Sequence, residues 1–230
     1  MAGLTLDMGQ ALALLHLTDS SFPTGAFSHS YGLETYTQAG IVHDAETLMA
    51  FITGRLLDGM ARFDLVLLRE AMHADLETVQ LLDAQLTAML PVYEVREASM
   101  QVGRRFLKAA LPLYGGERSG QYVARIQAKQ VRGHFVLAYG VIAGELEIEA
   151  ETALLAYAHT FVMGQAAAAV KLINMGQTRT QAVIRQMQPV MQNAVAHALS
   201  CTLEDIHTFT PAYDIRAMQH EYLFRRLFIS

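Results

Sequence analysis

The chain has 230 residues, of which 52% are hydrophobic and 17% charged. This balance excludes a disordered chain and predicts a sizeable core. The formal net charge is −5 and no basic stripe runs along the sequence, so nucleic acid is not an expected partner. The single cysteine cannot form an internal disulfide. A reducing compartment is therefore favoured, and we expect a cytoplasmic protein.

Helical periodicity dominates the first half, and no strand alternation persists. Asp44 is a good N-cap for a long helix. Pro91 and Pro112 are expected to stop the last two helices of this half, because proline lacks the N–H that a helix interior needs. The helices predicted in this half cover residues 12–18, 29–38, 44–72, 75–90 and 93–111.

The second half contains an uncharged run, residues 153–170, that is long enough to reach most of the way across a bilayer. His159, Thr160 and Gln165 interrupt it, and we prefer a buried helix, capped at Thr152, to a membrane span. Further helices are predicted at 119–131, 135–142 and 180–199, the last kinked or divided at Pro189. The expected fold is all-α: a single-domain helical bundle, residues 1–230, of roughly ten helices.

Sequence motifs for common catalytic sites are absent. The sequence has no Gly-x-x-x-x-Gly-Lys-Ser/Thr loop, no Gly-x-Gly-x-x-Gly and no Gly-x-Ser-x-Gly. His220-Glu221 begins like a zinc-protease motif, but Phe224 stands where the second histidine is needed. We therefore expect no enzyme, no catalytic residue and no cofactor.

One pattern resembles a metal site. His197 and Cys201 are four residues apart, with His207 six residues further on, and ligands one helical turn apart are typical of metal sites. A capping signal at Thr202 suggests that the helix breaks there. We prefer a core-facing histidine and a buried thiol, and we keep a metal carrier as the alternative.

Two charged clusters are interpreted as solvated surface. Glu145, Glu147, Glu149 and Glu151 alternate in an acidic run, which is typical of a loop or a helix entry. The sequence Arg104-Arg105-x-x-Lys108 (residues 104–108) is a modest basic cluster, interpreted as a solvated helix face and not as an anion site.

Two segments resist such an interpretation. The opening segment, residues 19–34, places Phe22, Phe27 and Tyr31 among glycines and small residues. Packing on the protein's own core and binding to another protein are equally good explanations for it. The run at residues 222–228 combines three aromatic residues with two arginines, a composition that favours interface centres. It is expected to dock, and we prefer a partner to its own domain.

The same segments resemble the urease accessory protein family UreF. The first matching block is Asp19-Ser20, Pro23-Thr24-Gly25-Ala26-Phe27 and Ser30-Tyr31-Gly32-Leu33-Glu34. The second is Gly133-His134-Phe135 with Tyr139-Gly140, and the third is Asp214-Ile215, Met218, His220-Glu221 and Arg226-Leu227-Phe228 through Ser230. The chain departs from the family pattern at Thr24, Ala26, Phe224, Arg225 and Ile229.

The resemblance implies an all-α homodimer without chemistry of its own. Such a protein binds UreD (UreH) and recruits the GTPase UreG, and the assembly delivers nickel to apo-urease. A nickel-binding metallochaperone using His197, Cys201 and His207 remains an alternative, as does a GTPase-activating protein that offers an arginine to UreG. Neither a nucleic acid nor a membrane is an expected partner. The resemblance and the composition together predict these partner-binding residues: Phe27, His29, Tyr31, His220, Tyr222, Phe224, Arg225, Arg226, Leu227 and Phe228.

Overall fold

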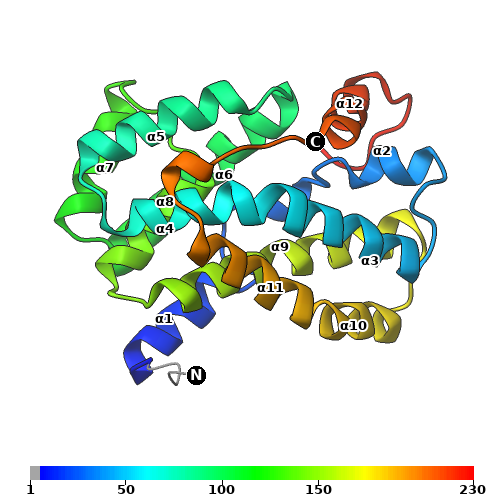
Figure 1. Ribbon diagram of the computed structural model, residues 1–230, viewed down its shortest axis with the longest axis horizontal. Coiled ribbons are helices and arrows are strands. Elements are labelled where there is room, and N and C mark those ends of the chain that lie inside the picture. The colour runs from blue at the N-terminus through cyan, green and yellow to red at the C-terminus, as the bar shows by residue number, and fades with distance from the viewer. Residues whose placement is uncertain (1–5) are drawn as a thin grey trace.

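The computed structural model describes residues 6–230, and over that range it consists of helices and their connections (Figure 1). The all-α prediction is confirmed, and residues 1–5 of the predicted domain lie outside the described part. The α-helices are α1 (Met8–Thr18), α2 (Leu33–Gln38), α3 (Ala45–Gly54), α4 (Asp64–His73), α5 (Leu76–Met89), α6 (Tyr93–Tyr114), α7 (Glu117–Gln127), α8 (Phe135–Glu145), α9 (Ala150–Leu172), α10 (Gln177–Gln186), α11 (Gln188–Ser200) and α12 (Pro211–Gln219).

Helix α8 is the most deeply buried helix, packed against α4 and α6 (Figure 1). Glycines allow this close approach. A Cβ on Gly140 would lie 2.7 Å from the Leu68 carbonyl oxygen, and one on Gly144 would overlap the Met72 carbonyl oxygen. On α6, a Cβ on Gly103 would overlap the Gly133 carbonyl oxygen. The backbones of α8 and its neighbours therefore touch directly.

Helix α9 contains the uncharged run and is only partly buried. It contacts α1, α2, α3, α4, α10 and α11. Its length and composition would allow it to cross a bilayer, but 44% of its apolar window is buried in the protein, and a single helix of this kind is weak support for a membrane span. It begins at Ala150 with Glu149 as N-cap, so the predicted cap at Thr152 is wrong. His159 lies on its exposed side.

The long helix predicted over residues 44–72 is interrupted. Asp44 does cap α3, through a reciprocal bond with Thr47. The chain then passes through a π-helical turn, η2 (Arg55–Gly59), and a 3-10 turn, η3 (Met60–Arg62), before α4 begins. Gly59, Met60 and Ala61 are all buried, so the apolar pattern continues through these turns and hydrophobic spacing does not reveal the interruption.

Two prolines behave differently from each other. Pro112 lies inside the last turn of α6, which continues to Tyr114, so the predicted stop there is wrong. Pro189 stands in the first turn of α11 and separates it from α10, one of the two outcomes expected.

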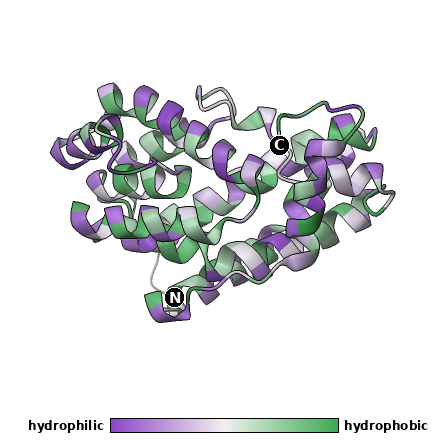
Figure 2. Ribbon diagram, turned by 90° about the horizontal axis from the view of Figure 1, so that it is seen from above, coloured by the Kyte–Doolittle hydropathy of each residue, from purple (hydrophilic) through white to green (hydrophobic). Residues whose placement is uncertain are grey.

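Figure 2 shows polar and apolar residues mixed along most helices, as expected where one face is buried and the other exposed.

The chain ends in a 3-10 turn, η5 (His220–Tyr222), followed by an irregular segment. We call residues 220–230 the tail. In Figure 1 the C-terminus lies beside α12 and α2, far from the N-terminus. This position brings the tail to the opening segment.

Candidate partner-binding surface

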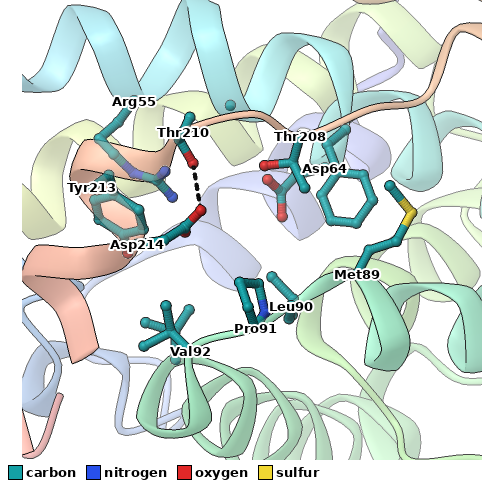
Figure 3. A pocket seen from close by; sticks show the side chains of 13 residues that line it. Arg55, Asp64, Met89, Leu90, Pro91, Val92, Thr208, Thr210, Tyr213 and Asp214 are labelled. Atoms are coloured by element: carbon teal, nitrogen blue, oxygen red, sulfur yellow. Dashed lines mark hydrogen bonds between the residues drawn. The ribbon is translucent and has the colours of Figure 1, made fainter.

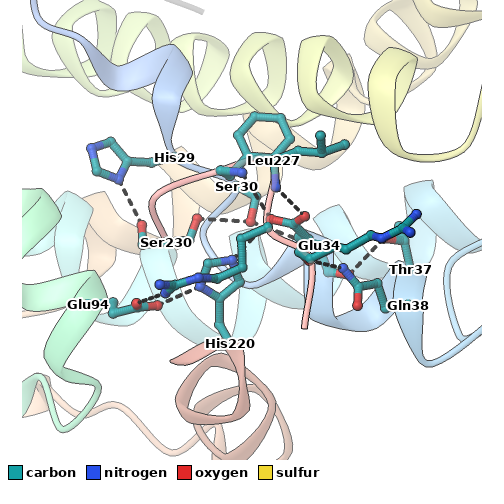
Figure 4. A network of polar contacts seen from close by, with 12 residues as sticks. His29, Ser30, Glu34, Thr37, Gln38, Glu94, His220, Leu227 and Ser230 are labelled. Carbon is teal, nitrogen blue, oxygen red and sulfur yellow. Dashed lines mark hydrogen bonds and ion pairs between the residues drawn. The ribbon is translucent and has the colours of Figure 1, made fainter. Parts of the chain in front are cut away.

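The tail lies beside the opening segment and is hydrogen-bonded to it (Figure 4). Ile229 N–H donates to the Ser28 carbonyl oxygen at 2.9 Å. The Ser230 carbonyl oxygen accepts from Ser30 N–H at 2.5 Å and from Tyr31 N–H at 3.1 Å. The Ser30 hydroxyl donates to the same carbonyl oxygen at 2.9 Å. The two segments that composition singled out therefore form one structural unit.

Glu34 connects α2 to the tail. Its Oε1 accepts from Leu227 N–H at 2.7 Å and its Oε2 from Phe228 N–H at 3.1 Å. The side chain is 1% exposed, so its charge requires compensation inside the protein. Two backbone donors supply part of it, and they fix the path of the tail over α2.

The His220 ring lies between two carboxylates. Its Nε2 is 3.1 Å from Glu34 Oε2, and its Nδ1 is 2.5 Å from Glu94 Oε2. Both ring nitrogens therefore face carboxylate oxygens. Arg226 donates to the other Glu94 oxygen at 2.8 Å. His220 and Arg226 thus link the carboxylates of Glu34 on α2 and Glu94 on α6 to the tail.

The Gly-Leu-Glu part of the opening segment has a physical explanation. Gly32 has φ +85°, and a Cβ at this position would lie 2.9 Å from the ring of Tyr213 on α12. Only glycine satisfies both constraints without strain. Leu33 is fully buried, which places Glu34 at the start of α2, facing the tail.

The predicted site residues divide into an inner and an outer set. His29, His220 and Phe228 are buried, and Tyr31 is half-buried. The His29 Nδ1 lies 2.8 Å from the Ser230 hydroxyl oxygen. Burial lowers the pKa of His29, and the nearby Arg105 lowers it further. Burial also raises the pKa of the Tyr31 hydroxyl. The inner set therefore lies within the contact between the tail and the rest of the protein and does not form the outer surface.

The outer set is exposed. Phe224 is 96% exposed and Tyr222 85%, and Leu227 and Phe27 are also largely open to solvent. Arg226 is partly exposed, but its guanidinium is already paired with Glu94. It would have to leave Glu94 before it could reach another protein, which weakens its candidacy as an arginine offered to a GTPase. The exposed members of the predicted set are Phe27, Tyr222, Phe224, Arg225, Arg226 and Leu227.

Composition alone missed the residues that organise this surface. The partner-binding residues predicted from sequence do not include Glu34, Glu94, Ser30 or Ser230. Glu34 and Phe228 are 194 positions apart, so no local pattern connects them.

A small cavity lies beside this unit, where η2 approaches α12 (Figure 3). The Arg55 guanidinium carbon is 3.5 Å from the centre of the Tyr213 ring. Burial raises the pKa values of Asp64 and Asp214, and Arg55 opposes both shifts. The volume of about 30 Å³ suits one or two water molecules and is far below that of a pocket for a small-molecule ligand.

The alternative metal site does not assemble. His197 Nε2 and Cys201 Sγ are 3.6 Å apart, but His207 bonds to the backbone oxygen of Asp205 instead. Within residues 6–230, no group of three or more His, Cys, Asp or Glu side chains could hold a metal ion. Within this range, His197, Cys201 and His207 therefore do not form a three-ligand set.

Comparison with known proteins places the chain in a family. The model of the UreF family matches residues 42–188. The urease accessory protein UreF of Paenarthrobacter aurescens is 37% identical over 225 residues, covering 95% of this chain and 97% of that protein. The proteins of the same name from Lachnoclostridium phytofermentans and Bacillus sp. (strain TB-90) are 34% and 33% identical, covering 95% and 97% of this chain and 98% and 100% of their own lengths. The chain belongs to the UreF family of urease accessory proteins.

Proposed function

We propose that this chain is a non-catalytic scaffold of urease maturation. It binds UreD (UreH) and recruits the GTPase UreG, so that nickel, the cargo of the assembly, is inserted into apo-urease. Family membership supports the accessory role. A scaffold influences a GTPase only if it binds one nucleotide state more tightly than the other, so differential affinity is the expected working principle.

The tail carries this proposal. Its aromatic side chains Tyr222 and Phe224 face solvent, while its backbone is fixed by Glu34 and by the pairing of Ser230 with the opening segment. A surface that is already ordered loses less entropy on binding than a flexible one. Exposed aromatic residues on such a surface are suited to anchor a partner.

The chain is also proposed to form a homodimer in the cytoplasm. Helix α9 offers a candidate surface, because its exposed side carries small and apolar residues in place of charges. His159, Met163, Gly164 and Ala167 follow one another at helical spacing on that side. An uncharged, partly exposed helix face of this kind is suited to pack against a second copy.

The proposal is tested by size-exclusion chromatography of the chain with UreD and UreG. A Tyr222→Ser, Phe224→Ser, Leu227→Ser variant removes the exposed apolar tail surface without touching the inner set. We expect it to remain folded and to lose the complex. A matched control, Leu81→Ser with Leu113→Ser, changes two exposed leucines on α5 and α6 and should elute with both partners. If the tail variant still co-elutes with both partners, the tail is not the contact.

A further inference from the structure

A cationic patch surrounds the point where the opening segment meets α6. Arg104, Arg105 and Lys108 are exposed on one side of α6. Arg104 Nε donates to the Arg132 carbonyl oxygen at 2.9 Å, which brings the exposed Arg132 alongside. Within residues 6–230, none of these four side chains forms an ion pair. Four unpaired cations thus gather on a chain whose net charge is −5.

The opening segment is fixed against this patch. Phe22 is buried, and its ring centre lies 5.7 Å from that of Phe106, the residue after Arg105. Gly25 has φ +74°, and a Cβ there would overlap the Arg105 guanidinium. The loop therefore rests on Arg105, and two residues later it presents Phe27, which is 68% exposed. An exposed aromatic residue beside arginines is the composition that interface centres favour.

We infer that Phe27, Arg104, Arg105, Lys108 and Arg132 form a second docking surface, which recognises an acidic protein surface. The unpaired cations define the chemistry of the occupant, because an acidic surface would neutralise them and accelerate encounter. A protein is favoured over a nucleic acid, because the chain is acidic overall and the patch contains an exposed apolar ring. The inference rests on the proposed function and adds a surface distinct from the tail.

The test reverses charge on the patch. In a Lys108→Glu, Arg132→Glu variant both changed side chains are exposed and make no side-chain hydrogen bond to residues 6–230. Arg105, on which the opening segment rests, is unchanged, so the fold should be retained. The matched control, Arg179→Glu with Arg185→Glu on α10, alters net charge by the same amount at another exposed site. Affinity for UreD and for UreG is measured for each variant over a salt series.

We expect the patch variant to lose about tenfold or more in affinity for one partner at about 0.15 M salt, with a weaker salt dependence. The control should change by about twofold at most. Equal effects of the two variants, or unchanged affinity of the patch variant for both partners, would overturn the inference. Displacement of the partner by a short DNA duplex, lost in the patch variant, would also overturn it in favour of nucleic acid.

The tail variant separates this inference from the proposed function. If serines at the tail abolish the complex while charge reversal at the patch changes nothing, the proposed function stands and the second surface fails. If the unmodified chain binds neither UreD nor UreG, both fail together.

Discussion

The contacts around α8 and those of the tail are built in opposite ways. Around α8, backbones touch because Gly103, Gly140 and Gly144 have no side chain. Under the tail, a buried carboxylate, Glu34, is surrounded by donors from distant parts of the chain. The first region depends on shape and the second on hydrogen bonds and charge. Damage to the first should unfold the protein, whereas damage to the second should release the tail from an intact body.

The largest expected effect is at the α4–α8 contact. A Gly144→Ala variant places a Cβ against the Met72 backbone, which cannot move without separating the helices. We expect the free energy of unfolding to fall by about 4 kcal/mol, measured by urea denaturation. Gly120→Ala on α7, where a Cβ meets no neighbouring atom, is the control and should be stabilising by up to about 1 kcal/mol. Similar results for both variants would show that close backbone packing is not decisive.

A buried polar cluster beside this core gives a pH dependence. His134 lies between Thr87 and Ser99, with ring nitrogens 2.9 Å and 3.0 Å from their hydroxyl oxygens. Burial lowers its pKa to about 4, below the ordinary value of about 6.5. The unfolded chain therefore binds a proton first as pH falls, so stability is lost between about pH 6.5 and pH 4, by about 3 kcal/mol in total.

The measurement compares urea denaturation across this pH range. A His134→Gln variant should lose less stability than the unmodified chain on acidification, although it begins less stable. The exposed His43 provides the control, and His43→Gln should leave the slope unchanged. An identical pH slope in the His134 variant would exclude this histidine as the cause.

The tail junction should respond locally. Glu34→Gln keeps the shape of the side chain but removes the charge that faces His220 and two backbone donors. We expect a loss of about 2 kcal/mol, appearing mainly as faster hydrogen exchange at the Leu227 and Phe228 amides. Amides of α8 should keep their protection. If α8 loosens together with the tail, the two regions form one cooperative unit and the contrast between them fails.

The same contrast explains what could be predicted from sequence. Helix caps are local, and Asp44 and Asp75 do start α3 and α5. The burial of a whole helix depends on contacts with distant parts of the chain. The uncharged sequence of α9 predicts a buried helix, but α8 is the more deeply buried of the two. Glycine lowers helix propensity, and the sequence alone does not show that Gly140 and Gly144 allow the close packing of α8.

In the candidate site, too, local features could be predicted from the sequence and contacts between distant segments could not. Aromatic residues and arginines near the chain ends identified the exposed members, such as Phe224 and Tyr222. The contact between Glu34 and His220 depends on folding of the intervening chain, and no composition or spacing indicates it. The basic cluster at Arg105 was interpreted as a solvated face, because the sequence does not show that the opening segment rests on it.

The smallest effect on stability is expected at the outer face of the tail. Phe224 is 96% exposed and Phe228 only 6%, although both lie in the irregular end of the tail. Phe224→Ala should change the free energy of unfolding by no more than about 0.5 kcal/mol, because almost none of the ring is buried in the folded protein. Phe228→Ala removes the buried ring by which the tail packs on the core, and it should increase hydrogen exchange at the Leu227 amide. Thermal unfolding and hydrogen exchange of the two variants check this together. A Phe224→Ala variant that unfolds as readily as Phe228→Ala would mean that the exposed ring supports the fold, and its availability to a partner would then be lost.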